Sequence, residues 1–313
     1  MRIAFYAPMK PPDHSVPSGD RRLARLFLQA LGQGGHRCEI ASRFVSRDGD
    51  GDRARQIRLR DVGEKLAARL VRRYRARPAD TRPQAWFTYH LYHKAPDWLG
   101  PPVAAALGIP YLIAEASTAP KRAGGPWDIG YTGANAAIAA ADAIFTVNSD
   151  DWGCVEALIE RKTYHKRLFP FVDAAPFVAA AARRENIRAG YAHQFGWPAD
   201  TPLLLAVGMM RAGAKRQSYH LLATALGQLT DQPWRLIVAG DGPCRDEIAQ
   251  ELAALAPGRA TLLGELNESQ LADAYAAGDM LVWPAADEAF GMSLLEAQAA
   301  GLPVIAGKQR GVP

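Results

Sequence analysis

The sequence predicts an α/β protein built from two Rossmann-like domains that face a cleft, and three observations support this fold class. Short apolar runs alternate with Ala- and Leu-rich stretches at helical spacing, this alternation occurs in two series, and a polar break separates the series. Strands that are apolar along their length, each followed by a helix, are typical of parallel sheets covered on both faces. A (β/α)₈ barrel would show a similar alternation, but the strand count exceeds eight and the break contains no strand.

The expected elements follow the chain in order. The first series has strands Ile3–Ala7, Arg37–Ala41, Ala85–Tyr89, Ile109–Ala114, Ala143–Val147 and Arg167–Phe169, with helices Asp20–Gly32, Gly63–Arg75 and Ala95–Leu107. The second has strands Leu203–Val207, Arg235–Ala239, Thr261–Leu263, Met280–Trp283 and Pro303–Ala306, with helices Ser218–Gln228, Arg245–Leu255, Glu268–Ala277 and Ser293–Ala300.

The break between the two series lies around 174–200 and carries a helical stretch, Ala179–Phe195, that ends at Gly196-Trp197-Pro198. We therefore expect an N-terminal domain over 1–178 and a C-terminal domain over 179–313. The second series reaches Ala306 and continues only into Gly311-Val312-Pro313, which has the composition of a loop. We expect this second domain to be incomplete, as in a truncated chain.

The composition is that of an ordinary globular protein. Of the 313 residues, 49% are hydrophobic and 22% are charged, and the three cysteines are too far apart for a disulfide framework or a zinc knuckle. The apolar run at the N-terminus is too short for a signal peptide, and no run of about 18 apolar residues occurs. We expect a cytoplasmic protein.

The net charge of +5 is unevenly distributed. Between Arg53 and Arg77 there are ten Lys or Arg and two acids, so this segment carries 10 − 2 = +8 and the rest of the chain 5 − 8 = −3. This concentration disfavours a general nucleic-acid binder. The segment predicts an amphipathic helix with Leu59, Val62, Leu66 and Leu70 on one stripe. That stripe would dock on its own sheet, and the alternative is peripheral contact with an anionic inner membrane surface.

The densest chemical signal is a pair of glutamates that follow the Met280–Trp283 strand. Glu288 lies in the loop and Glu296, eight positions later, lies in the next helix. A carboxylate accepts two hydrogen bonds and so matches the vicinal hydroxyls of a sugar or ribose, and the free N–H groups near Gly291–Leu294 would favour a phosphate. The alternative is that Glu288 is a solvated loop acid and that Glu296 only complements the helix dipole.

These residues resemble a known family. Glu288-Ala289-Phe290-Gly291 and Glu296-Ala297-Gln298-Ala299-Ala300-Gly301-Leu302-Pro303-Val304 are similar to the glutamate–seven residues–glutamate motif of the retaining glycosyltransferases of family four. Five further stretches agree. Three lie in the second half, in order: Val207-Gly208 with Arg211 and Lys215, Val238-Ala239-Gly240-Asp241-Gly242-Pro243, and Leu262-Leu263-Gly264. Two lie in the first half: Pro170-Phe171-Val172-Asp173 and Pro17-Ser18-Gly19. The family has the GT-B fold, in which two Rossmann-like domains face each other and the second holds the nucleotide-sugar donor.

The resemblance implies a role for each matching residue on the donor side. Glu288 would contact the donor sugar and Glu296 the ribose hydroxyls, while Arg211 and Lys215 would neutralise the departing diphosphate. The alternative for this basic pair is a solvated loop. Further donor-binding positions are implied at Phe290, Gly291, Met292, Ser293, Gly19, Gly240 and Gly264.

On the acceptor side the chain departs from the family. Many members carry a histidine after the fourth strand of the first domain, where this chain has Ala116 between Glu115 and Ser117. The sugar contact would then move to Glu115, Ser117 or His90.

The function implied is metal-independent, retaining transfer of a sugar from a UDP- or GDP-sugar to a glycan or lipid-linked acceptor in cell-surface glycan or polysaccharide synthesis, with no other cofactor. The alternatives are a non-catalytic nucleotide-sugar-binding partner or fragment, and a nicotinamide-dependent oxidoreductase or epimerase.

Three weaker motifs have plainer interpretations. Gly240-x-Gly242 follows a strand, but Arg245 stands where a dinucleotide fingerprint needs its third glycine, so a tight turn is favoured. The Asp48–Asp52 loop lacks the glycine and glutamate of a calcium loop, which indicates a surface loop. His90 and His93 have no third ligand nearby in the sequence, so no metal site is expected.

Overall fold

The computed structural model describes residues 1–16, 18–198, 200–288, 290–309 and 312, and the chain divides into two compact units. The first unit is Met1–Phe169 and the second is Pro170–Pro313. The division falls before the expected boundary at residue 178 because helix α6 (Ala175–Ala181) packs against α10 (Glu268–Ala277) of the second unit.

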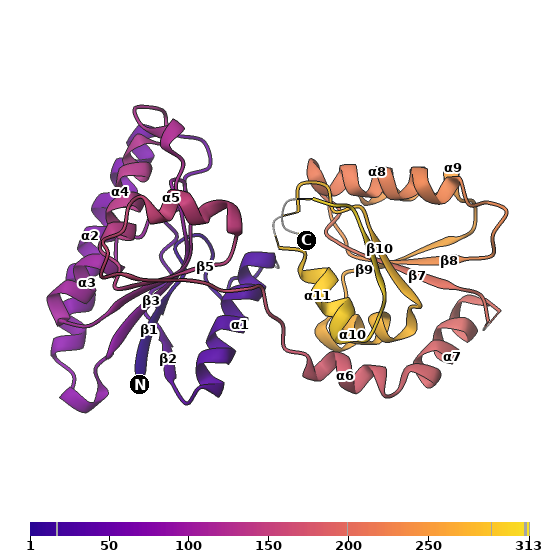
Figure 1. The fold of residues 1–313 in the computed structure, drawn as a ribbon, viewed down its shortest axis with the longest axis horizontal. Coiled ribbons are helices and arrows are strands. Elements are labelled where there is room, and N and C mark those ends of the chain that lie inside the picture. The colour runs from indigo at the N-terminus through magenta and orange to yellow at the C-terminus, as the bar shows by residue number, and fades with distance from the viewer. Residues whose placement is uncertain (17, 199, 289, 310–311, 313) are drawn as a thin grey trace. The chain divides into compact units, whose positions relative to one another are not determined.

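The first unit contains a six-stranded parallel sheet in the order β2-β1-β3-β4-β5-β6 (Figure 1). Its strands are β1 (Arg2–Tyr6), β2 (Arg37–Ile40), β3 (Ala85–Leu91), β4 (Tyr111–Ala116), β5 (Ala143–Thr146) and β6 (Tyr164–Arg167). The central strand β3 is buried at every position except His90, because it is covered on both faces.

Helices lie on both faces of this sheet. They are α1 (Gly19–Gln33), α2 (Arg53–Arg75), α3 (Gly100–Leu107), α4 (Asp128–Ala139) and α5 (Trp152–Glu156). Helix α2 contacts α3 and α4, and Figure 1 shows α1 on the other side of the sheet from α2 and α3. This double covering is what a nearly continuous apolar strand pattern requires.

The second unit contains a five-stranded parallel sheet in the order β11-β10-β7-β8-β9. Its strands are β7 (Leu203–Val207), β8 (Arg235–Ala239), β9 (Ala260–Gly264), β10 (Met280–Trp283) and β11 (Val304–Ala306). Its other helices are α7 (Arg184–Phe195), α8 (Ala214–Gly227), α9 (Arg245–Leu255) and α11 (Met292–Ala299). Figure 1 shows α8 and α9 on one face of this sheet and α6 and α10 on the other.

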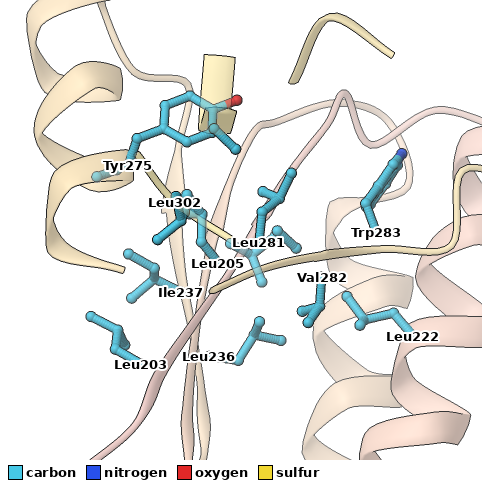
Figure 2. Close-up of a cluster of buried hydrophobic side chains, with 14 of the residues drawn as sticks. Leu203, Leu205, Leu222, Leu236, Ile237, Tyr275, Leu281, Val282, Trp283 and Leu302 are labelled. Atoms are coloured by element: carbon cyan, nitrogen blue, oxygen red, sulfur yellow. The ribbon is translucent and has the colours of Figure 1, made fainter. Parts of the chain in front are cut away.

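The core of the second unit is formed by strand side chains and the helices above and below them. Figure 2 shows Leu205, Ile237 and Leu281 between Tyr275 on one side and Leu222 on the other. The polar atoms of Tyr275 and Trp283 point toward the same end of this cluster, away from Leu203 and Leu236 (Figure 2). Their hydrogen-bonding groups therefore lie at the edge of the core.

The predicted fold class is confirmed, and the differences concern element boundaries. Strand β6 ends at Arg167, although the expected strand began there. The expected helix Ala179–Phe195 is two helices, α6 and α7, separated at Ala182–Arg183. Helix α3 begins at Gly100 rather than Ala95, and α4 and α5 were not expected. Helix α4 is rich in Ala and Gly, so its sequence carries little of the polar–apolar periodicity that marks a helix.

Helix α2 is longer than expected, and its buried face differs from the predicted stripe. It begins at Arg53 because the Asp52 side chain accepts a hydrogen bond from the Arg55 amide. The buried residues are Gln56, Gly63, Ala67, Leu70 and Tyr74. Of the predicted stripe only Leu70 is buried, and Val62 is 44% exposed. The helix docks through small residues, which a search for large apolar side chains does not detect.

Candidate functional site

Each sheet has one point at which the strand order reverses direction, and open α/β sheets bind ligands beside the carboxyl ends of the strands there. In the second sheet this point lies between β7 and β10, which pair directly. Lys215 lies in the first turn of α8, shortly after β7, and Glu288 lies in the loop that leaves β10. The fold therefore brings together two predicted residues that are 73 positions apart.

Lys215 and Glu288 form an ion pair. The Lys215 Nζ atom donates to Glu288 Oε2 at 2.5 Å, and the side chains are 22% and 15% exposed. Burial alone would raise the pKa of Glu288, but Lys215, the Gly291 backbone N–H and the Trp283 indole lower it below the ordinary value. Lys215 Nζ also lies 5.3 Å from the centroid of the Trp283 ring. The carboxylate is thus ionised and oriented, which suits it to accept hydrogen bonds from a polyol.

The loop that carries Glu288 is held in an unusual backbone conformation. Ala285 and Asp287 have φ values of 57° and 47°, in the left-handed region that residues with a side chain rarely adopt. Ser218 of α8 anchors the loop by accepting a hydrogen bond from the Ala286 amide at 3.0 Å. Strain of this kind persists only where the surrounding structure enforces it, and it is common at ligand sites.

The donor-binding positions after Glu288 lie at the start of α11. Gly291 is the N-cap with φ 60°, and no side chain caps this end. The N–H groups of the first turn, including Met292 and Ser293, have no intrahelical acceptors. Phe290 lies half-buried beside them. Ala289 lies outside the described residues.

Glu296 lies in the body of α11 and is only 2% exposed. The Tyr275 hydroxyl on α10 donates to Glu296 Oε2 at 2.9 Å and also lies 3.1 Å from the Ser293 carbonyl oxygen. The carboxylate is therefore positioned by a neighbouring helix and is not a solvated surface acid. Glu288 and Glu296 are thus held by different elements, Glu288 by Lys215 of α8 and Glu296 by Tyr275 of α10.

The other predicted donor residues lie in loops at the same edge of the sheet. Arg211 is exposed in the loop before α8, and no described side-chain contact joins it to Lys215 or Glu288. Gly240 follows β8 with φ 146°, and a Cβ atom there would lie 1.9 Å from the Gly208 carbonyl oxygen. The Gly240 amide donates to the carbonyl of Gly264, the last residue of β9. The Gly240-x-Gly242 turn thus permits close packing of the loops that follow β7, β8 and β9.

The predicted acceptor residues of the first unit also gather at a reversal of strand order, which lies between β1 and β3. The neighbouring strands β3 and β4 carry His90 and Glu115, both in the left-handed region with φ 57° and 61°. His90 Nδ1 lies 3.7 Å from Glu115 Oε1 and 2.9 Å from Asp20 Oδ1 on α1. Ser117 donates to Asp151 Oδ1 at 2.7 Å.

These contacts shift the pKa values of His90 and Glu115. Burial alone would lower the pKa of His90, but Glu115, Asp20 and Asp151 raise it to about 9. Burial raises the pKa of Glu115 to about 7 against the opposing effect of His90. The imidazole is therefore protonated at neutral pH, while Glu115 titrates near neutrality.

Gly19 is the first residue of α1 and is exposed. A Cβ atom built on it would have no other atom within 4 Å. Pro17, part of the predicted Pro17-Ser18-Gly19 loop, lies outside the described residues, as do Gly311 and Pro313 of the C-terminal loop.

Four residues near the two sites were not predicted: Asp20, Ser218, Tyr275 and Trp283. Asp20 directly follows Gly19, so its place after the first strand could have drawn attention to it. Ser218 and Tyr275 lie within predicted helices, and nothing in their spacing indicates which loop or carboxylate they reach. Trp283 ends β10 and reads as an ordinary core residue.

The other motifs have structural roles. Asp48 is buried and accepts a hydrogen bond from Gln56, and Asp52 caps α2. Burial followed by the charges of Arg122 and Lys94 lowers the pKa of His93 to about 4. Among the described residues, no three His, Cys, Asp or Glu side chains are placed to hold one metal ion. None of the helices in the described ranges has both the length and the hydrophobicity needed to cross a membrane.

Comparisons with solved structures support the fold of the whole chain. Sucrose-phosphate synthase from Thermosynechococcus elongatus superposes with a TM-score of 0.65 at 20% identity, over 99% of this chain and 82% of that one. Anabaena HepE, solved in complex with UDP and glucose, superposes with a TM-score of 0.62 at 16% identity, over 99% and 81% of the two chains. Both are similar in fold along nearly the full length of this chain.

Comparisons of sequence match less than half of the chain. The family model "Glycosyl transferases group 1" matches residues 201–313. Sulfoquinovosyl transferase SQD2 of Arabidopsis thaliana is 33% identical over 114 residues, which are 36% of this chain and 21% of that protein. A D-inositol 3-phosphate glycosyltransferase of Xylanimonas cellulosilytica is 31% identical over 148 residues, 46% of this chain and 34% of that protein. The matches thus span a fifth to a third of these relatives.

The family matches the expectation drawn from the motif around Glu288 and Glu296, and the structural neighbours match the expected architecture. The second unit, over residues 201–313, is thus similar to the glycosyl transferases group 1 family, and the chain has the GT-B fold.

Proposed function

We propose that the chain is a glycosyltransferase that moves a sugar from a nucleotide-diphosphate sugar to a hydroxyl acceptor. The observation that carries this proposal is the Lys215–Glu288 pair at the strand-order reversal of the second sheet. This ion pair would give the second unit a cation suited to a diphosphate and, in contact with it, a carboxylate suited to a sugar hydroxyl. The families of the sequence relatives, and the UDP and glucose in the HepE complex, support the same substrate class.

The second unit would bind the donor. The diphosphate would draw Lys215 away from Glu288, with Arg211 as a second cation, and the uncapped start of α11 would contribute N–H groups from Gly291 to Ser293. Glu288 would then accept hydrogen bonds from the sugar. Glu296, held by Tyr275, would accept them from the ribose hydroxyls after a small movement that exposes it. The turns at Gly240 and Gly264 would lie near the base, which we propose to be that of UDP or GDP.

In the reaction the bond between the anomeric carbon and the phosphate oxygen breaks, and a bond to the acceptor oxygen forms. The acceptor proton would pass to the departing phosphate oxygen. We propose that the acceptor attacks from the face that the diphosphate leaves, so the anomeric configuration is retained, and that no metal is needed because Lys215 and Arg211 neutralise the developing charge. The acceptor side of the proposal is the first unit, with Gly19, His90, Glu115 and Ser117.

The acceptor would be a glycan or a lipid-linked sugar of cell-surface polysaccharide synthesis, and the chain would work at the inner face of the membrane. The exposed arginines of α2, including Arg58, Arg69 and Arg72, give this helix the charge to contact an anionic surface. Flotation with anionic liposomes, compared with neutral ones, tests this part; equal recovery of the chain from both would refute it.

The central test compares donor hydrolysis and transfer by the wild type with Lys215→Ala and Glu288→Ala. Removal of one group that stabilises transition-state charge costs about 10²–10³-fold in kcat. Lys162→Ala is the matched control, because Lys162 is 82% exposed and far along the chain from the site. Unchanged rates in both site variants would refute the assigned roles. Calorimetric binding of UDP or GDP without turnover would instead support a non-catalytic nucleotide-sugar-binding partner.

A further inference from the structure

Trp283 contacts both partners of the ion pair in the second unit. It is the last residue of β10 and is 1% exposed, and the loop that follows it carries Glu288. The Lys215 Nζ atom lies 5.3 Å from the centroid of its ring, and its indole N–H interacts with the Glu288 carboxylate. The side chain of a tryptophan has no other polar group, and this one can only donate. Trp283 therefore presents its ring to the cation and its N–H to the carboxylate.

The indole N–H has hydrogen-bonding capacity that its surroundings do not use fully. Its nitrogen is buried, yet it makes no hydrogen bond of normal geometry with the described residues. Figure 2 shows this nitrogen directed away from Leu222. The short bond to Glu288 comes instead from Lys215, whose Nζ atom lies 2.5 Å from Oε2. A buried donor of this kind is rare in native proteins and requires an explanation.

The ring of Trp283 is held in place by its neighbours. Tyr219 of α8 packs against it in a T-shaped arrangement, with the ring centroids 5.0 Å apart, and the Tyr219 hydroxyl donates to the Gly208 carbonyl oxygen at 2.6 Å. A Cβ atom built on Gly208 would lie 2.9 Å from Trp283 Cη2, so the backbone that follows β7 packs closely on the ring. The indole can therefore keep its position while Lys215, which has a flexible side chain, moves.

We propose that Trp283 is a positioning residue for the donor sugar: its indole N–H holds Glu288 once a diphosphate has drawn Lys215 away. The Glu288 side chain is 15% exposed, and a carboxylate so buried needs a partner when its cation leaves. A carboxylate has about four acceptor positions, so a bond from the indole leaves others for the hydroxyls of the sugar. This inference rests on the proposed function, because it requires a diphosphate at Lys215.

The test follows the indole N–H signal of Trp283 in proton–nitrogen NMR spectra of the full chain. Triple-resonance assignment identifies this signal among those of the seven tryptophans. Saturation with UDP or GDP should move it downfield as the hydrogen bond to Glu288 forms, and Glu288→Ala should abolish this shift. In mildly alkaline buffer without nucleotide, Lys215→Ala should already place the signal downfield, because Glu288 then has no lysine partner.

The outcomes separate this inference from the proposed function. Binding of UDP or GDP with an unchanged Trp283 signal, an equal shift in Glu288→Ala, or an unchanged signal in Lys215→Ala would overturn the inference and leave the proposed function intact. If neither nucleotide binds, the proposed function fails and this inference fails with it.

Turnover of UDP-glucose or GDP-glucose, whichever the wild type hydrolyses, gives a second readout. Trp283→Phe keeps a ring face for Lys215 and removes the N–H, so the affinity for UDP or GDP should change less than about twofold while kcat falls about tenfold. Lys215 is the charged group that acts on Glu288, and loss of the indole donor should raise the pKa of this carboxyl. The acid limb of the pH profile of kcat/KM should therefore move to higher pH.

Trp234→Phe is the matched control for this substitution. Trp234 lies just before β8, is 5% exposed, and donates its indole N–H to the Leu229 carbonyl oxygen at 2.8 Å. Its replacement should lower stability without changing kcat or the acid limb. Equal changes in the two variants, or no change in a folded Trp283→Phe variant, would contradict the positioning role. Circular dichroism checks the folding of both, and the spectra of the wild type and Lys215→Ala keep the test valid if Trp283→Phe does not fold.

Discussion

The two units place charged residues at the same topological point and arrange them in different ways. In the second unit Lys215 pairs with Glu288. Burial alone would raise the pKa of Glu288, but Lys215 more than offsets this effect together with hydrogen bonds, so the pKa is lowered. In the first unit one histidine serves several carboxylates, and the pKa of Glu115 is raised to about 7. The parallel sheet determines where a site can form. The local balance of charge then sets the protonation state of the groups in it, an ionised Glu288 beside Lys215 and a Glu115 that titrates near neutrality beside His90.

The largest expected effect is on stability, in a comparison of alanine substitutions at Gly240 and Gly19. Gly240→Ala would place a Cβ atom 1.9 Å from the Gly208 carbonyl oxygen in a backbone conformation that alanine avoids, so we expect a loss of about 4 kcal/mol in unfolding free energy. Gly19→Ala meets open space at the start of a helix and should change stability by less than about 1 kcal/mol. Urea denaturation measures both. Similar losses in the two variants would contradict the view that only Gly240 is required for packing.

A smaller difference in stability is expected between phenylalanine substitutions at two buried tyrosines, Tyr275 and Tyr89. Tyr275→Phe removes the donor to the buried carboxylate of Glu296, which should cost about 2 kcal/mol. Tyr89→Phe removes a buried hydroxyl that interacts with the Glu115 carboxylate but has no hydrogen bond of normal geometry within the described residues, so the loss of stability should be smaller, within about 1 kcal/mol. Thermal and urea unfolding without ligand would measure the difference. A larger loss for Tyr89→Phe would mean that its hydroxyl already has a stabilising partner.

The smallest effect concerns the titration of His90. Because Glu115 is the main charge that raises the pKa of His90 to about 9, Glu115→Gln should lower that pKa toward the ordinary value. A histidine with a raised pKa stabilises the folded state below its unfolded pKa and loses this contribution as the pH rises through the folded pKa. The wild type should therefore lose it near pH 9 and the variant at lower pH. Histidine NMR titration follows the shift directly, and an unchanged His90 pKa would show that Glu115 does not raise it.

Much of the fold was predictable because its signal is local. Strands such as Leu203–Val207 and helices such as Arg245–Leu255 and Glu268–Ala277 were predicted at their observed bounds, since each carries its own apolar pattern and end signals. The buried face of helix α2 was predicted wrongly because the helix packs through small residues such as Gly63, which lies against Trp98, and Ala67, and small side chains look like surface positions in a sequence. The break between α6 and α7 was likewise not predicted, because the alanine-rich sequence that precedes it shows no change of pattern.

By itself, the sequence determined the α/β class, the two series of elements, and the candidate residues Glu288, Glu296, Lys215, His90 and Glu115. Only the tertiary structure decided which of these meet: Lys215 with Glu288, His90 with Asp20 and Glu115, and Glu296 with Tyr275. The reason is that local patterns depend on neighbours a few residues apart. A site forms where the ends of strands far apart in the chain are brought together, and the pKa of each group there depends on the burial and charge of everything around it.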